Sequence, residues 1–254
     1  MKSSPLPPYA AALLLGFAVA VTQSAPAQDV VVRKSGQKLE GRIVGTKGNS
    51  IKIELKDGPR GAATSVPFAD LKELQMQPPA EFEAAAAQLS RGDATGAAAA
   101  LQKINENFAG LDAPWFQRAA VMLGDAKLAA GDKEGAKAAY DQFAKANPSA
   151  IGLANLGMAR LALESGDPAG AETLLSALLE QSSKTALPEP ADRASLGQAC
   201  YLMGRVKEAG GDKAGALESY LKASALFPFD KNAVADAQKR AEALRNENPG
   251  LIVP

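Results

Sequence analysis

The chain has 254 residues, a formal net charge of +0 and an aromatic content of only 5%. This balanced charge gives no electrostatic reason to expect nucleic acid or an anionic membrane as a partner. Histidine is absent, which excludes His-based triads, histidine general bases and imidazole-ligated zinc, and the single cysteine, Cys200, excludes an internal disulfide. We therefore expect no cofactor and no metal, and we interpret Cys200 as a buried packing residue.

Residues 1–27 have the features of a secretory signal peptide. Lys2 supplies a positive start, Tyr9–Val21 is an apolar run too short to span a bilayer, and Ala25-Pro26-Ala27 has the small-x-small form of a cleavage site. We predict a mature chain that starts at Gln28 and is periplasmic or secreted. An uncleaved membrane anchor is the alternative, and no later segment is apolar enough to cross a membrane.

Residues 28–77 form a second region, with β-branched residues in alternation between glycine-bearing turns. The alternation predicts four or five short strands, which favours a small β-barrel similar to SH3-like or Sm-like barrels. Acidic residues interleave with the basic ones and no aromatic platform is present, so we do not expect RNA binding. The strands are expected at Val30–Val32, Lys38–Thr46, Ile51–Leu55, Thr64–Pro67 and Leu71–Met76.

Gln77-Pro78-Pro79 separates this region from a helical one, in which a helix is predicted at Ala80–Ser90. A six-residue motif, Gly-Asp-x-x-Gly-Ala, then repeats within residues 78–230. Each copy follows one alanine- and leucine-rich helical pattern and precedes the next. The four copies begin at Gly92, Gly131, Gly166 and Gly211.

This motif is typical of the corner between two consecutive helices. Its first glycine suits the left-handed residue that follows a helix, and its aspartate suits the N-cap of the next helix. Its second glycine costs roughly 1 kcal/mol inside a helix relative to alanine. We attribute that residue to two backbones that approach too closely for a larger side chain, with the following alanine in the same contact.

The repeat resembles the tetratricopeptide repeat family, most clearly at Gln117–Ala150 and Gly197–Asp230. Each of these two copies has a glycine seven residues before the corner, an aromatic residue nine after it and a proline seventeen after it. The family's first-helix tryptophan and tyrosine are missing, and the copies at Gly92 and Gly166 have leucine in place of the aromatic residue. The residues that carry the resemblance are Gly124, Tyr140 and Pro148, and then Gly204, Tyr220 and Pro228.

The predicted fold is therefore mainly α: a solenoid of about four helix pairs, with a small all-β domain before it. Longer connectors are expected near Phe108–Pro114 and Gln181–Asp192. Because an open solenoid end needs a polar-faced cap, we assign residues 231–246 to a C-terminal capping helix, N-capped by Asp230. Residues 247–254 are expected to form a tail that is disordered or docks as a strand.

The family resemblance implies a concave face, lined by the first helix of each pair, that binds a protein segment. Arg160 and Arg205 occupy equivalent places and are candidates for holding a carboxylate, although ordinary solvated arginines are the alternative. The Lys/Asn set of carboxylate-clamp family members is absent. The candidate groove residues are Arg118, Val121, Asp125, Leu128, Leu153, Leu156, Arg160, Leu163, Gln198, Tyr201, Arg205 and Glu208.

Trp115-Phe116 is expected to fill the space beside the long connector; a partner hot spot is the alternative. The first functional hypothesis is a non-enzymatic scaffold that binds another envelope protein. A second is a cell-wall protein whose β domain binds peptidoglycan. A third is an envelope hydrolase that uses carboxylates such as Glu172 and Glu180, which lie on one helix.

Overall fold

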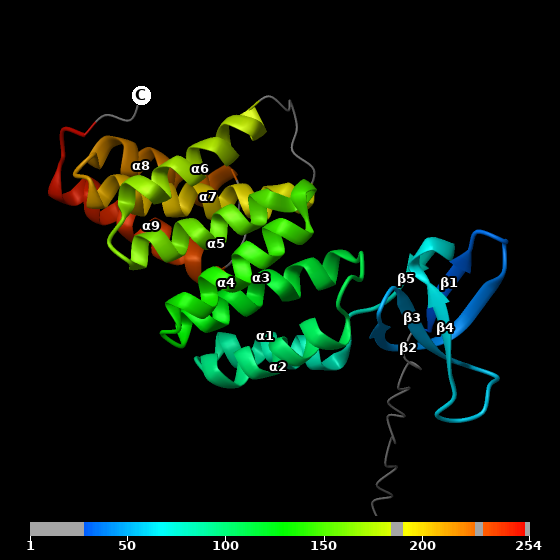
Figure 1. Ribbon diagram of the computed structural model, residues 1–254. Coiled ribbons are helices and arrows are strands. Elements are labelled where there is room, and N and C mark those ends of the chain that lie inside the picture. The colour runs from blue at the N-terminus through cyan, green and yellow to red at the C-terminus, as the bar shows by residue number, and fades with distance from the viewer. Residues whose placement is uncertain (1–27, 184–189, 227–230, 252–254) are drawn as a thin grey trace, which may run out of the picture.

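The structure is a computed structural model that describes residues 28–183, 190–226 and 231–251. A small sheet lies beside the first helices of a stack of antiparallel helices (Figure 1). The predicted signal peptide at 1–27 and the proposed N-cap Asp230 lie outside the described residues. Within them, the mainly α fold with an N-terminal β region is confirmed, and no helix among the described residues is long and apolar enough to cross a membrane.

Five antiparallel strands form the sheet, in the order β4-β3-β2-β1-β5. Each lies within two residues of its predicted position, because the alternation of apolar and polar residues is strong: in β2 every second residue from Leu39 to Gly45 is buried. The strands are β1 Asp29–Arg33, β2 Lys38–Lys47, β3 Ser50–Leu55, β4 Ala63–Pro67 and β5 Leu71–Gln75.

A 3-10 turn at Phe68–Asp70 redirects the chain so that β5 pairs with β1, at the opposite edge from β4. Among the described residues β4 pairs only with β3, so the sheet has two open edges. The likeness to SH3-like or Sm-like barrels thus stays a prediction. Asp29 fixes the start of the sheet, since its carboxylate accepts hydrogen bonds from the backbone N–H groups of Ile43 (2.8 Å) and Gln77 (3.2 Å).

Nine helices follow in the described part of the chain, and the first begins and ends where the sequence predicted. They are α1 Ala80–Ser90, α2 Ala94–Asn107, α3 Pro114–Ala129, α4 Lys133–Ala146, α5 Ile151–Glu164, α6 Pro168–Ser183, α7 Pro190–Ala209, α8 Lys213–Leu221 and α9 Lys231–Glu247. A 3-10 turn, Pro148–Ala150, precedes α5, and a π turn, Lys222–Leu226, continues α8.

The four corners have the predicted geometry. Each leading glycine has a positive φ between 78° and 85°, the left-handed region that a side chain would disfavour. Each following aspartate accepts a hydrogen bond from the backbone N–H three residues later, at 2.8 to 2.9 Å. The corners therefore end one helix and begin the next four times over.

The second glycine of each corner was attributed to a close approach of two backbones, and this explanation is wrong. A Cβ at Gly96, Gly135 or Gly170 would overlap the carboxylate of its own N-cap aspartate rather than the backbone of another helix. Gly215 has the same neighbour, with the stem of Lys207 close by. Glycine at this position therefore leaves room for the cap, and the stability of the cap offsets the low helix propensity of glycine.

A second glycine in the two best copies makes room for a tyrosine. Tyr140 is fully buried between α3 and α5, where a Cβ at Gly124 or at Gly157 would overlap its ring. Tyr220 fills the same place against Gly204. In the two copies that have Leu101 and Leu175 instead, the position of Gly124 is held by Ala85 and Ala159, all of them buried. The size of the second-helix residue thus sets the size of its first-helix neighbour.

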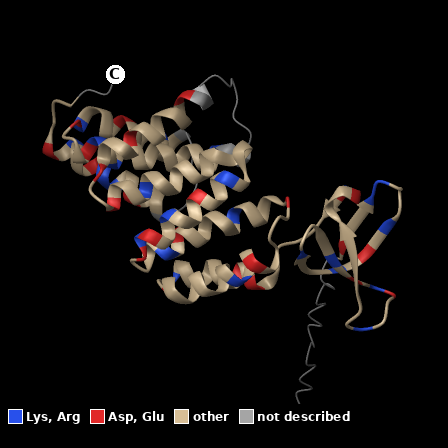
Figure 2. Cartoon of the chain, in the orientation of Figure 1, with Lys and Arg blue, Asp and Glu red and all other residues tan. Residues whose placement is uncertain are grey.

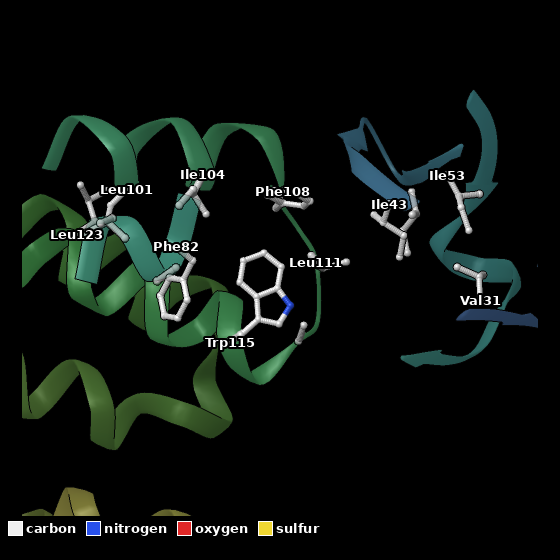
Figure 3. Close-up of a cluster of buried hydrophobic side chains, with 14 of the residues drawn as sticks. Val31, Ile43, Ile53, Phe82, Leu101, Ile104, Phe108, Leu111, Trp115 and Leu123 are labelled. Carbon is white, nitrogen blue, oxygen red and sulfur yellow. The ribbon is translucent and has the colours of Figure 1, made fainter. Parts of the chain in front are cut away.

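The sheet and the first three helices share one apolar core (Figure 3). The long connector between α2 and α3, predicted at Phe108–Pro114, lies against the sheet. The Thr46 hydroxyl contacts the carbonyl oxygens of Asn107 (3.3 Å) and Ala109 (2.9 Å), and the Phe68 ring packs on Gly110. The long connector therefore provides part of the surface on which the sheet packs.

Trp115, at the start of α3, fills this junction. It is 5% exposed and packs edge-on against Phe108 and Phe116, at ring-centroid distances of 5.2 and 5.9 Å, and against Phe82 at 6.2 Å. Trp115 thus acts as the predicted hydrophobic plug, and it is not accessible as a partner hot spot. Cys200 is also buried, and burial raises the pKa of its thiol to about 11.

Candidate protein-binding face

The first helices of successive pairs contact one another in sequence: α3 touches α5, α5 touches α7 and α7 touches the final helix α9. We call the side formed by α3, α5, α7 and α9 the binding face (Figure 1). Neighbouring first helices can hold an extended segment across several pairs, which is how such solenoids present a surface. Figure 2 shows charges of both signs interspersed along these helices, so this face has no single-sign field.

The predicted groove residues divide into three groups. Leu128 and Leu156 are 4% and 2% exposed and pack inside the helix stack, so they cannot contact a partner. The second group is accessible, with Arg118 exposed over the Phe82 ring at 5.6 Å. Its half-buried members are Val121, Leu153, Leu163, Gln198 and Arg205.

The third group is held by internal polar networks. Asp125 on α3 accepts a hydrogen bond from the Tyr140 hydroxyl (2.6 Å) and forms an ion pair with Arg160 on α5. Burial disfavours the charged guanidinium, but the Asp125 carboxylate outweighs it and raises the pKa of Arg160. Burial first, and then Asp125, raises the pKa of Tyr140. Arg160 is therefore engaged in joining two helix pairs.

A larger network joins α7, α8 and α9. The Asp236 carboxylate accepts hydrogen bonds from the Tyr201 hydroxyl and from Arg240 Nε, both at 2.7 Å. Arg240 also pairs with Glu208 at 3.1 Å, and Glu208 accepts a hydrogen bond from the Tyr220 hydroxyl at 2.5 Å. Hydrogen bonds and neighbouring carboxylates raise the pKa of Arg240, and burial, followed by hydrogen bonding to Glu208, raises that of Tyr220.

Sequence reasoning missed Asp236 and Arg240, because it treated the final helix only as a polar cap. Their spacing of four residues was the available signal, since an Asp and an Arg one turn apart on a helix can pair. It also missed that Tyr140 and Tyr220 direct their hydroxyls back to carboxylates on the first helix of their own pair.

The carboxylates considered for hydrolysis, Glu172 and Glu180, are both exposed on α6. Within the ranges the structure describes, no group of three or more Cys, Asp or Glu side chains is placed to hold a metal ion. The binding face remains the candidate site.

The tetratricopeptide repeat family model matches residues 121–184 and 156–231, which contain α4 to α8. Over residues 121–231 the helical repeats are thus similar to that family. A search of curated proteins found no match.

Solved structures with similar helix arrangements include two described as kinesin light chain nearly identical TPR-like repeats from Podosopora anserina. The first has 18% sequence identity and a TM-score of 0.47, and the match covers 69% of this chain and 90% of that one. The second has 17% identity and a TM-score of 0.46, with 66% and 85% covered.

Proposed function

We propose that this protein is an exported, non-enzymatic scaffold that binds a segment of another envelope protein across the binding face. The observation that carries the proposal is the row of adjoining first helices, α3, α5, α7 and α9, in repeats supported as tetratricopeptide repeats. Repeats of this kind imply protein partners. The accessible residues of the face combine apolar and polar side chains, a composition suited to a protein segment.

In this proposal the sheet has a structural role. Its apolar core is continuous with that of α1, α2 and α3, and the Thr46 hydroxyl bonds to the connector at the end of α2. The sheet therefore stabilises the first helices by extending their apolar core.

A paired set of variants tests the binding face. Arg118→Glu combined with Gln198→Arg changes charge on α3 and α7. The matched control, Lys137→Glu combined with Ala177→Arg, places the same new residues at exposed positions on α4 and α6. Using the chain from Gln28 as bait in envelope extracts, we expect the wild type and the control to retain the same partner and the face variant to lose it. Equal retention by all three proteins would contradict the proposal.

Export is tested separately. Expression of the full chain followed by cell fractionation should yield a protein outside the cytoplasm whose first residue is Gln28. A protein that stays in the cytoplasm and retains Met1 would contradict the export part of the proposal and leave the binding face untouched.

A further inference from the structure

Arg205 occupies the place in its helix pair that Asp125 and Arg160 occupy in theirs, six residues before the corner glycine. At the preceding step of the stack, Arg160 pairs back to Asp125 on the previous first helix. The equivalent partner for Arg205 is Arg160, which has the same charge and is already paired. At the equivalent position of the preceding helix pair, Arg205 therefore finds a positive charge and not a carboxylate.

On its other side Arg205 lies within electrostatic reach of Asp236 on α9. Burial opposes ionisation of Asp236, but hydrogen bonds from Arg240 and Tyr201 and the charges of Arg240 and Arg205 together lower the pKa of its carboxyl. Both hydrogen bonds end on the same oxygen, Oδ2. Arg205 makes no hydrogen bond or ion pair in the part of the chain that the structure describes, although its charge interacts with Asp236 and Tyr201.

The surroundings of Arg205 are fixed by neighbours that do make such bonds. Tyr201, one turn earlier on α7, is held by its hydrogen bond to Asp236, and its ring packs at 6.1 Å from that of Tyr220. Arg205 itself is half-buried on the same face. A half-buried guanidinium with five donors and no bound acceptor, beside an ordered aromatic ring, suits a carboxylate ligand.

We propose that Arg205 determines the specificity of the binding face by pairing with the side chain of an aspartate or glutamate in the partner segment. This inference rests on the proposed function, because it names the chemistry of the segment that the face binds. It assigns different roles to two equivalent arginines: Arg160 joins helix pairs, and Arg205 contacts the ligand.

The probe is a random peptide library displayed on phage and selected on the chain from Gln28. Each selected peptide is synthesised in its acidic form and with each Asp or Glu replaced by Asn or Gln, and Kd is measured for the wild type, Arg205→Gln and Arg245→Gln. Arg245 is exposed on the side of α9 that lies beside Leu221 and Ser224, away from the binding face, and serves as the matched control. We expect neutralising one acidic residue to weaken binding to the wild type and the control about tenfold, and to have no effect on binding to Arg205→Gln.

Thermal unfolding of Arg205→Gln is measured in parallel. Because Arg205 forms no hydrogen bond or ion pair within the described residues, we expect the Tm of the wild type, and a clear loss of Tm would mean that Arg205 is structural. Peptides that bind without needing an acidic residue, or that need one equally in Arg205→Gln, would overturn the role of Arg205 and leave the scaffold function standing. Selection that yields no peptide at all would overturn both.

Discussion

The two ends of this molecule are held together by different forces. From the sheet to α3, a continuous apolar core is filled by aromatic and branched side chains around Trp115. From α3 to α9, three smaller apolar clusters are supplemented by polar networks that join one helix pair to the next. The first region is held mainly by apolar packing, whereas the second adds charged side chains that join its helix pairs and includes Arg205, the arginine proposed to contact a ligand.

This contrast explains why a repeat architecture can specialise. The stability of a core such as the one around Trp115 depends on the apolar area that it buries, and a binding partner does not change that area. An ion pair between two stacked first helices depends on the charge of one residue in each helix pair. If one of these residues changes sign, the other loses its partner and becomes available to a ligand. Four predictions separate the two regions, in order of decreasing effect.

Replacing Trp115 with alanine should remove the plug at the junction of sheet and helices. We expect a loss of about 3 to 5 kcal/mol in the free energy of unfolding, as for other buried aromatic residues, measured by denaturant titration. Trp115→Phe, which keeps a ring in the site, should lose clearly less. Equal stability of Trp115→Ala and the wild type would show that the sheet and helices do not share a core.

Adding a methyl group at Gly124 tests the packing between repeats. The new Cβ would overlap the Tyr140 ring, and we expect a loss of about 1 to 3 kcal/mol. Combining Gly124→Ala with Tyr140→Leu recreates the Ala85–Leu101 pairing found in the first copy and should recover part of that loss. Purely additive losses in this double-mutant cycle would contradict the size rule.

Arg160→Gln and Arg205→Gln are the same chemical change at equivalent positions. We expect Arg160→Gln to lose about 1 to 2 kcal/mol, because it leaves the half-buried Asp125 carboxylate without its charged partner. Arg205→Gln should lose nothing measurable. Similar losses in both variants, measured by thermal unfolding, would contradict the distinction between a joining and a binding arginine.

The buried tyrosines predict a loss of stability at alkaline pH. Burial raises the pKa of Tyr140 and Tyr220, so above the unfolded value of 10.0 the unfolded chain releases these protons while the folded chain keeps them. The free energy of unfolding should therefore fall as pH rises above about 10, by up to about 1.4 kcal/mol per pH unit for each tyrosine. Tyr140→Phe and Tyr220→Phe should each reduce the slope; a slope unchanged in both variants would argue against this origin.

The corners and strands could be predicted from the sequence because their signals are local. A glycine with positive φ, an aspartate cap and a period-two alternation each act within a few residues, and all appear where expected. The docking of the sheet could not be predicted, since Thr46 and Ala109 are far apart in the chain and neither has a distinctive signal.

For the binding face, sequence reasoning assigned residues to the first helices of the pairs but could not separate them by role. Arg160 and Arg205 look alike in the sequence, and only the charge at the equivalent position of the preceding pair distinguishes them. Leu156 was assigned to the same face. Its side of α5 is covered by the neighbouring helices, so Leu156 belongs to the core.

The binding face is tested most directly by hydrogen–deuterium exchange of the chain from Gln28 with and without a bound peptide from the library. We predict that binding slows exchange in α5, α7 and α9, centred on the segment around Arg205, and leaves β1 to β5 and α6 unchanged. Slower exchange in the sheet or in α6, with α7 unaffected, would contradict a ligand site on the first helices.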